Sequence, residues 1–292
     1  MERTIGGRKK LKLSIPLIIA SGPAGFGEYG KLEDFPWEDV GAFTLKTVTF
    51  KGKEGNKPPR MYAKNGYIIN RIGLENPGIN AFLEALQAKE FDWLFEKTSV
   101  ILSLGGDSYE EYVEISKLIK PYANRFKAIE YNFSCPNVKH GGLSIIASKD
   151  EWVKLLYEIR SILDQEFLVA KLGIEGGFVE HQAKIVSDAG WDGVTVVNTV
   201  RGLMFNDEGE MIVGGLSGPN LFPITLRAVF EVRKLNPKLY IIASGGIYNG
   251  DDAIKLLKVG ADAVSVGSLL LKNEKVVSQI AHHVREYLGN SS

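Results

Sequence analysis

The sequence predicts a single (β/α)8 TIM barrel, an α/β fold, with loop and hairpin insertions at its C-terminal face. Short apolar runs recur through the whole chain, several of them continuous rather than alternating, as in parallel strands buried on both faces. Stretches with helical periodicity separate most of these runs. The length of 292 residues suits one barrel of roughly 250 residues with insertions. No linker, repeat or low-complexity tract divides residues 1–292, so we expect one domain.

The predicted strands follow one another along the chain, at 15–20, 42–48, 100–105, 128–133, 167–172, 193–198, 240–244 and 263–267. The clearest helices between them are expected at 108–120, 149–163, 178–189 and 250–259. Ser108 stands where a helix should begin, and Gly190 where one should end. An open doubly wound sheet is the alternative fold. GPAGFG at 22–27 argues against it, because it lacks the G-x-G-x-x-G spacing of a dinucleotide-binding turn.

Two excursions interrupt this alternation. Residues 50–69 are rich in lysine and contain a Pro-Pro pair, and residues 201–220 are typical of a hairpin that turns at 206–209. In a barrel, such insertions are either lids over the active site or surface loops with no role. The residues alone leave both interpretations open.

Composition excludes several classes of function. Lys plus Arg and Asp plus Glu are both 35, so the formal net charge is 35 − 35 = 0, which argues against a broad nucleic-acid or membrane surface. Cys135 is the only cysteine, and one thiol supplies neither an intrachain disulfide nor an iron–sulfur cluster. The first residues imitate a signal peptide, but their apolar stretch is short and contains Pro16. No apolar run approaches the ~20 residues that span a bilayer. We expect a cytoplasmic protein.

Polar residues gather where the predicted strands end. Lys46-Thr47 ends the second strand and Lys171 the fifth; the other strand ends with polar residues are 132–137, 198–199, 244–246 and 267–268. Because barrel active sites form at this end of the strands, we expect a functional cluster there. Gly245-Gly246 and Gly267-Ser268 stand where barrels commonly bind phosphate through backbone N–H groups. The ligand is therefore expected to carry a phosphate.

Cys135 has two interpretations. A free cysteine is most often a small buried hydrophobe. Cys135, however, lies in a polar, asparagine-rich segment, where a thiol can serve as a general base. The four histidines show no metal-ligand spacing with acidic residues, so we expect no metal site.

Nine segments together resemble one family. They are ASGPAGFGEYG at 20–30, TLKTVT at 44–49, NRIGLENPG at 70–78, NFSCPNVKHGG at 132–142, KLG at 171–173, VVNTVRG at 196–202, GGLSGPNLFP at 214–223, SGGI at 244–247 and VGSLL at 266–270. Over residues 14–270 the chain resembles the catalytic subunit of dihydroorotate dehydrogenase, class 1B, among the FMN-dependent pyrimidine enzymes. The NxSCPN segment is the most specific of these motifs, and the VKHGG after it is similar to the class 1B form.

The resemblance implies one FMN at the barrel mouth and oxidation of (S)-dihydroorotate to orotate in pyrimidine biosynthesis. It implies Cys135 as general base at C5, with hydride transfer from C6 to flavin N5, and Lys46 as the second catalytic position. The matching FMN positions are Ser21, Lys46, Thr47, Asn132, Lys171, Val197, Gly218, Gly245, Gly246, Gly267 and Ser268. The matching substrate positions are Lys46, Asn70, Gly73, Leu74, Asn132, Asn137, Asn198 and Thr199. Lys171 would stabilise negative charge on the reduced flavin.

The resemblance also implies a partner. In class 1B a subunit with FAD and an iron–sulfur cluster carries electrons to NAD⁺, and we expect it on a homodimer core of this chain. Two single residues, Arg71 and Ser103, depart from the family's usual small residue and asparagine, and the stretch AKNGYIIN at 63–70 differs from its usual glycine-and-Met pattern. A related FMN oxidoreductase acting on another dihydropyrimidine or small unsaturated ring therefore stays open. So do a Schiff-base lyase that uses Lys171 or Lys46 as nucleophile and a non-catalytic interaction subunit.

Overall fold

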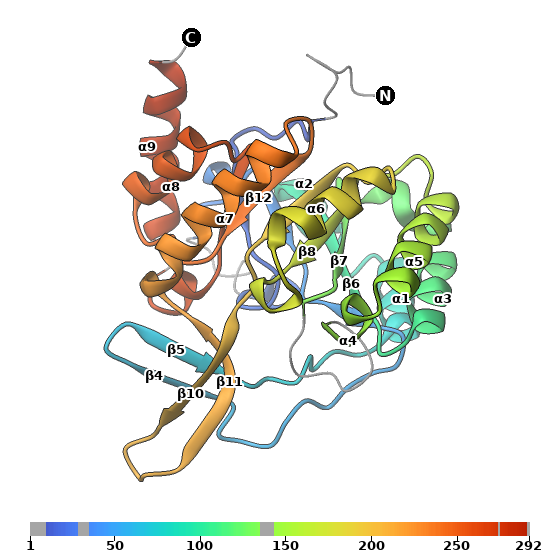
Figure 1. The fold of residues 1–292 in the computed structure, drawn as a ribbon, viewed down its shortest axis with the longest axis horizontal. Helices are drawn as coiled ribbons and strands as arrows, with labels where there is room; N and C mark the ends of the chain where they lie inside the picture. The colour runs from blue at the N-terminus through green and yellow to red at the C-terminus, as the bar shows by residue number, and fades with distance from the viewer. Residues whose placement is uncertain (1–9, 29–34, 135–142, 274, 291–292) are drawn as a thin grey trace.

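The computed structural model describes residues 10–28, 35–134, 143–273 and 275–290 (Figure 1). Its larger sheet has nine strands in the order β2-β1-β13-β12-β9-β8-β7-β6-β3, and β2 also pairs with β6, which closes the sheet into an eight-stranded barrel. The barrel strands are β1 (Leu17–Ile19), β2 (Ala42–Thr44), β6 (Ser99–Gly105), β7 (Ala128–Asn132), β8 (Leu168–Leu172), β9 (Gly193–Val196), β12 (Tyr240–Ser244) and β13 (Ala263–Val266). β3 (Val48–Thr49) pairs with β6 at Leu104 and Gly105, further along the strand than the β2–β6 pairing. The predicted barrel is confirmed, with every predicted strand in place.

Helices cover the outside of the barrel (Figure 1). They are α1 (Ile79–Gln87), α2 (Asp92–Lys97), α3 (Tyr109–Ile119), α4 (Leu143–Ala147), α5 (Lys149–Ile162), α6 (Val179–Asp188), α7 (Phe222–Leu235), α8 (Gly250–Lys258) and α9 (Val276–Gly289). Ser108 caps α3 as predicted, because its hydroxyl accepts the Glu111 N–H at 3.3 Å. No helix within the described ranges is both long enough and apolar enough to cross a bilayer.

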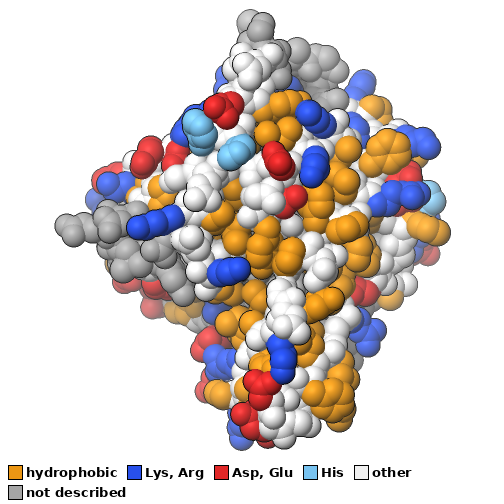
Figure 2. Space-filling view, turned by 90° about the vertical axis from the view of Figure 1, so that its left-hand side faces the viewer, with side chains coloured by type: hydrophobic (Ala, Val, Ile, Leu, Met, Phe, Trp, Pro, Cys, Tyr) orange, Lys and Arg blue, Asp and Glu red, His pale blue; other side chains and the backbone are white. Residues whose placement is uncertain are grey.

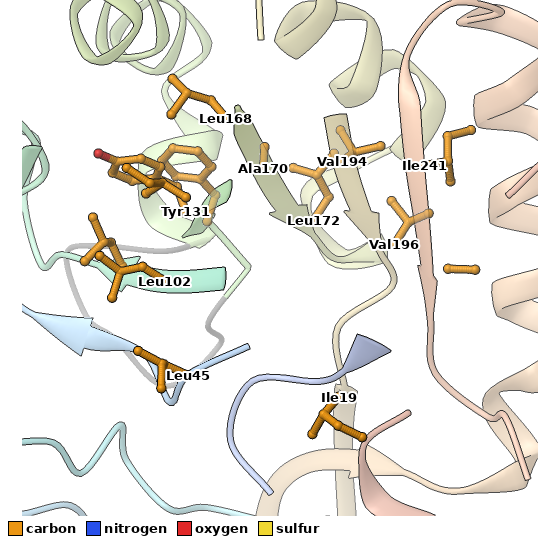
Figure 3. Close-up of a cluster of buried hydrophobic side chains, with 14 of the residues drawn as sticks. Ile19, Leu45, Leu102, Tyr131, Leu168, Ala170, Leu172, Val194, Val196 and Ile241 are labelled. Carbon is orange, nitrogen blue, oxygen red and sulfur yellow. The ribbon is translucent and has the colours of Figure 1, made fainter. Parts of the chain in front are cut away.

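Side chains of the barrel strands alternate between two apolar cores. Those facing the helices form the larger core, and Figure 3 shows part of it, including Tyr131, Ala170 and Val194. The alternate positions face the barrel interior, where Val169 and Ile242 belong to a smaller apolar cluster near the amino ends of the strands. Nearer the carboxyl ends the strands carry buried polar residues: Thr44, Ser103, Glu130, Asn132, Lys171, Thr195, Ser244 and Ser265. The barrel is therefore apolar at its floor and polar at its carboxyl end.

A second, antiparallel sheet stands beside the barrel (Figure 1). It consists of β10 (Val200–Phe205), β11 (Met211–Ser217), β5 (Tyr67–Asn70) and β4 (Met61–Lys64), in that order. The predicted hairpin at 201–220 is confirmed as β10–β11. The excursion at 50–69, which was not predicted to contain strands, supplies most of the β4–β5 hairpin. The pairing of β11 with β5 joins the two insertions into one sheet.

An arginine ties the amino end of the barrel together. Arg160, on α5, donates to Asp192 Oδ2 at 2.6 Å and to the carbonyl oxygens of Leu163 at 3.1 Å and Glu166 at 3.0 Å. The same oxygen of Asp192 accepts the N–H of Leu168, the first residue of β8, at 2.9 Å. Because Asp192 directly precedes β9, this group connects one helix with two neighbouring strands.

The same arrangement recurs two strands later. Arg233, on α7, donates to Asp262 Oδ2 at 2.6 Å, and that oxygen accepts the N–H of Ile241 in β12 at 2.9 Å. Asp262 directly precedes β13. In both groups the arginine stands eight residues before the strand residue, since 168 − 160 and 241 − 233 are equal. We call Arg160–Asp192 and Arg233–Asp262 the two arginine clamps.

Candidate active site

The predicted site residues that the structure describes gather at one end of the barrel, which we call the mouth. Neighbouring barrel strands are parallel, so their carboxyl ends lie on the same rim. The residues there are Ser21 after β1, Lys46 and Thr47 after β2, Asn132 in β7, Lys171 in β8, Val197, Asn198 and Thr199 after β9, Gly245 and Gly246 after β12, and Gly267 and Ser268 after β13. Cys135 and Asn137 lie outside the described residues.

Hydroxyl groups connect the neighbouring strands β1, β2 and β6 at the mouth. Ser21 Oγ donates to the Leu45 carbonyl oxygen at 2.8 Å and lies 3.4 Å from Thr47 Oγ1. Thr47 Oγ1 is in turn 2.9 Å from Ser103 Oγ, and both side chains are buried. Ser103, one of the residues that depart from the family pattern, therefore holds the Thr47 side chain from the neighbouring strand β6.

Lys171 is a buried cation at the mouth. It lies on the inner face of β8, because its neighbours Ala170 and Leu172 face the helices (Figure 3). The residue is 7% exposed, and its ammonium forms no hydrogen bond or ion pair with any residue that the structure describes. A buried charge without a partner is unfavourable. The site therefore favours a ligand that presents negative charge or acceptor atoms to Lys171.

Two asparagine side chains at the mouth are oriented by the protein itself. Asn132 Oδ1 accepts both the N–H and the hydroxyl of Ser134 at 3.3 Å. Asn198 Nδ2 donates to Ser134 Oγ at 3.0 Å, and Asn198 Oδ1 accepts the N–H of Thr199 at 2.9 Å. The structure thus brings Asn132, Asn198 and Thr199 together around Ser134, which the sequence analysis did not single out.

The second sheet contributes Asn70 to the same region. Asn70 ends β5 and its Nδ2 donates to the Gly215 carbonyl oxygen of β11 at 3.3 Å. A Cβ atom on Gly215 would overlap Thr199 Oγ1 and would lie 3.5 Å from Asn70 Nδ2. Gly215 therefore allows Asn70 and Thr199 to approach each other. These two predicted substrate residues are far apart in the sequence, and both lie against Gly215.

Lys46 faces a carboxylate that the sequence analysis missed. Lys46 Nζ lies 3.8 Å from Glu75 Oε2, and Arg60 Nη1 donates to the same oxygen at 2.8 Å. The hydrogen bond and charge of Arg60 hold the pKa of Glu75 below its ordinary value. A cavity of about 520 Å³ opens beside this group. Of the predicted site residues it is lined by Lys46 alone, so it adjoins the mouth rather than containing the whole site.

The segment leading to Glu75 carries two more predicted substrate residues. Gly73 and Leu74 both have positive φ, 81° and 55°, which is uncommon for a residue with a side chain. Asn76 holds this conformation, because its Nδ2 donates to the Leu74 carbonyl oxygen at 2.6 Å. Arg71, which also departs from the family pattern, donates from Nε to the Pro59 carbonyl oxygen at 2.8 Å. Its side chain is therefore bound to the segment that precedes β4.

The glycines after β12 have backbone N–H groups that no described residue accepts. Neither Gly245 nor Gly246 donates its backbone N–H to any described residue. Gly246 has φ of 76°, and a Cβ there would overlap the backbone nitrogen of Phe222. At the predicted phosphate position, the described residues thus leave the backbone N–H groups of Gly245 and Gly246 unused. Gly218, by contrast, lies at the end of β11, where a Cβ would overlap the Gly66 carbonyl oxygen in the β4–β5 turn.

Glu130 is a second carboxylate that the sequence analysis missed. It is buried on the inner face of β7, and the signal was available: a charged residue inside the run AIEY at 128–131, whose other residues are apolar or aromatic. Within the described residues, no three histidine, cysteine, aspartate or glutamate side chains gather as a metal site.

Comparison with known proteins gives consistent matches. A family model described as dihydroorotate dehydrogenase matches residues 8–288. A protein of Thermotoga maritima named dihydroorotate dehydrogenase B (NAD(+)), catalytic subunit, is 54% identical over 94% of this chain and 98% of its own length. The protein of the same name from Caldicellulosiruptor bescii is 38% identical over 95% of this chain and 91% of its own. A crystal structure of the Eimeria tenella enzyme in complex with ferulenol has the same fold, with a TM-score of 0.79 and 23% identity, covering 94% of this chain and 82% of the other.

Proposed function

The chain belongs to the dihydroorotate dehydrogenase family, and from that premise we propose that it is the FMN-dependent catalytic subunit that oxidises dihydroorotate to orotate in pyrimidine biosynthesis. The observation that carries the proposal is the 54% identity to a protein of that name along 94% of this chain. The polar mouth described above supports the proposal, because Lys46, Lys171 and Asn198 lie on one rim there.

The mouth fits FMN on two independent counts. The unpaired ammonium of Lys171 suits the acceptor-rich pyrimidine ring of a flavin, and the unused N–H groups of Gly245 and Gly246 suit a phosphate. Ser21, Thr47, Asn132, Val197, Gly218, Gly267 and Ser268 complete the proposed cofactor set. The chemistry that FMN supplies when bound is the acceptance of a hydride.

The chain's own residues bind the substrate and move its proton. Lys46 supplies a cation for the substrate carboxylate, and its ion pair with Glu75 orients it. Asn70, Asn132 and Asn198 offer amide groups to the C=O and N–H groups of a pyrimidine ring. Asn137, Gly73, Leu74 and Thr199 complete the proposed substrate set. Cys135 takes the proton from C5, next to a carbonyl.

The visible spectrum of the purified chain tests the cofactor and the substrate together. We expect the purified protein to be yellow, or to bind added FMN tightly. We expect dihydroorotate to bleach the flavin band under anaerobic conditions. A flavin band that dihydroorotate fails to bleach would retain the cofactor and reject the substrate. Failure to bind FMN at all would reject the proposal.

Substitution of Cys135 tests the proposed base. Cys135→Ser should keep the fold and FMN binding and lose most turnover near pH 7, because a hydroxyl is a far weaker base than a thiol. The matched measurement is the FMN dissociation constant of both proteins. Near-normal turnover of the variant at pH 7 would remove Cys135 from the mechanism.

A partner subunit is the remaining part of the proposal. The relatives are named as catalytic subunits, and we propose a partner with FAD and an iron–sulfur cluster that passes electrons to NAD⁺. The chain exposes apolar side chains on one face of the β10–β11 hairpin, Leu203, Phe205, Met211 and Val213, and such patches are typical of interaction surfaces. Figure 2 shows hydrophobic side chains along one face of the molecule.

Two measurements on the purified chain test this assembly. We expect a homodimer by light scattering, and slow or no NAD⁺ reduction by the chain alone. Efficient reduction of NAD⁺ without a partner would contradict the proposed electron path. A monomer at micromolar concentration would contradict the homodimer core.

A further inference from the structure

Glu130 is a buried carboxylate that no step above uses. It is 4% exposed, and its Oε2 accepts the Thr195 hydroxyl at 2.7 Å. Its other oxygen, Oε1, is buried and has no hydrogen-bond partner among the described residues. Burying an acceptor without a donor is unfavourable. A carboxyl group in this position therefore needs a reason beyond packing.

The strand register places Glu130 next to Lys171. Its strand neighbours Ile129 and Tyr131 belong to the helix-facing core, so Glu130 points into the barrel interior, as Lys171 does from β8. Across the ladders, Lys171 pairs with Asn132 of β7 on one side and with Thr195 of β9 on the other. Glu130 lies two residues before Asn132 and reaches across β8 to bond Thr195. Its carboxylate therefore lies below Lys171, on the floor side.

The other buried carboxylates of the described chain have a cation of their own. Asp192 is paired with Arg160 and Asp39 with Arg285. Glu130 forms no ion pair with a described residue, and neither does Lys171, the one buried lysine in the described ranges. Among the described residues of the barrel interior, the Glu130 carboxyl thus has no cation and the Lys171 ammonium no anion, and Thr195 bonds the first and stands beside the second in the strand register.

We propose that Glu130 is a positioning residue that acts through Lys171. Its carboxylate lies on the floor side of Lys171 and offsets the positive charge of the Lys171 ammonium. It therefore sets the electrostatic potential that this ammonium produces at the mouth. Charges in a low-dielectric interior interact strongly without direct contact. The part of this inference that concerns FMN rests on the proposed function. The charge pairing itself does not, because it is a property of the chain without any ligand.

The first test is a double-mutant cycle on the FMN-free protein. Urea unfolding is measured for wild type, Glu130→Gln, Lys171→Met and the double variant, with Thr195→Val as the matched control for the hydrogen bond. We expect Glu130→Gln to lower the folding equilibrium constant on the order of tenfold. Lys171→Met should restore part of that loss, because it removes the cation left without a counter-charge.

Additive effects of the two substitutions would overturn the pairing, as would a Thr195→Val variant that reproduces the whole Glu130→Gln loss. If Glu130→Gln does not fold, refolding of the double variant supports the pairing, and failure of the double variant overturns it. This cycle is informative even if the chain binds no FMN, so it separates the pairing from the proposed function.

The second test is the midpoint potential of bound FMN, measured by spectroelectrochemistry. Glu130→Gln should change the preference for reduced over oxidised FMN on the order of tenfold when Lys171 is present. In the Lys171→Met background the same substitution should change it far less. An equal shift in both backgrounds, or no shift in either, would show that Glu130 does not act through Lys171.

Discussion

The arginine clamps should make a large contribution to the stability of the barrel, and Asp192→Ala measures it. The Asp192 side chain is 4% exposed and that of Arg160 15%, so the pair is shielded from water. The substitution removes two charge-assisted hydrogen bonds, to Arg160 at 2.6 Å and to the Leu168 N–H at 2.9 Å. At about 1.5–3 kcal/mol each, these agree with the ~3–5 kcal/mol typical of breaking a buried pair. We therefore expect a loss of about 3–5 kcal/mol in the free energy of unfolding.

Equilibrium unfolding in urea is the assay, with fluorescence and circular dichroism as independent probes. The matched control is Lys184→Ala, which breaks the exposed Lys184–Asp188 pair one turn apart on α6 and should cost no more than about 0.5 kcal/mol. Asp262→Ala, in the second clamp, should repeat the Asp192→Ala loss, because its contacts have the same geometry. A loss for Asp192→Ala no larger than that of the control would refute the reasoning.

Three further predictions concern single positions. Gly246→Ala should weaken FMN binding, measured by calorimetry, and should destabilise the fold by at least about 1–2 kcal/mol. The reason is that a side chain at φ of 76° is strained and would overlap Phe222. Unchanged affinity for FMN would exclude this glycine from the cofactor site. Burial, followed by the hydrogen bond to Glu158, raises the pKa of Tyr109 to about 12. The neutral phenol is therefore favoured in the folded state, and the stability of the fold falls as pH rises from ~10 to about 12. Tyr109→Phe should flatten this part of the pH–stability curve. An unchanged slope would contradict the raised pKa of Tyr109. Ser108→Ala should cost about 1 kcal/mol in urea unfolding through loss of the α3 cap, and a loss near zero would show that the cap is dispensable.

The barrel strands could be predicted because each is a short apolar run whose neighbours in sequence become its neighbours in space. IPLIIA at 15–20 and FLVAKL at 167–172 contain β1 and β8, and the polar residues that interrupt or follow such runs mark the mouth. Parallel topology alone then places Lys46, Lys171 and Gly246 on one rim. This part of the site follows from local pattern and chain direction.

The rest depends on contacts between distant segments, which no local pattern encodes. At 61–70 the β4–β5 hairpin carries exposed and half-buried residues, with Ile69 alone buried, and its position is set by its pairing with β11. No local pattern around Glu75 indicates that the fold places it beside both Arg60 and Lys46. Glu130 stood out in an apolar run, yet its significance depends on the register that places Thr195 beside Lys171.

Because β11 pairs with β5, the two insertions form one sheet. Asn70 and Gly215 are 145 residues apart in the chain, yet a hydrogen bond joins them directly. Neither hairpin can move away from the other without breaking that pairing. A change of length in either insertion would displace a residue carried by the other.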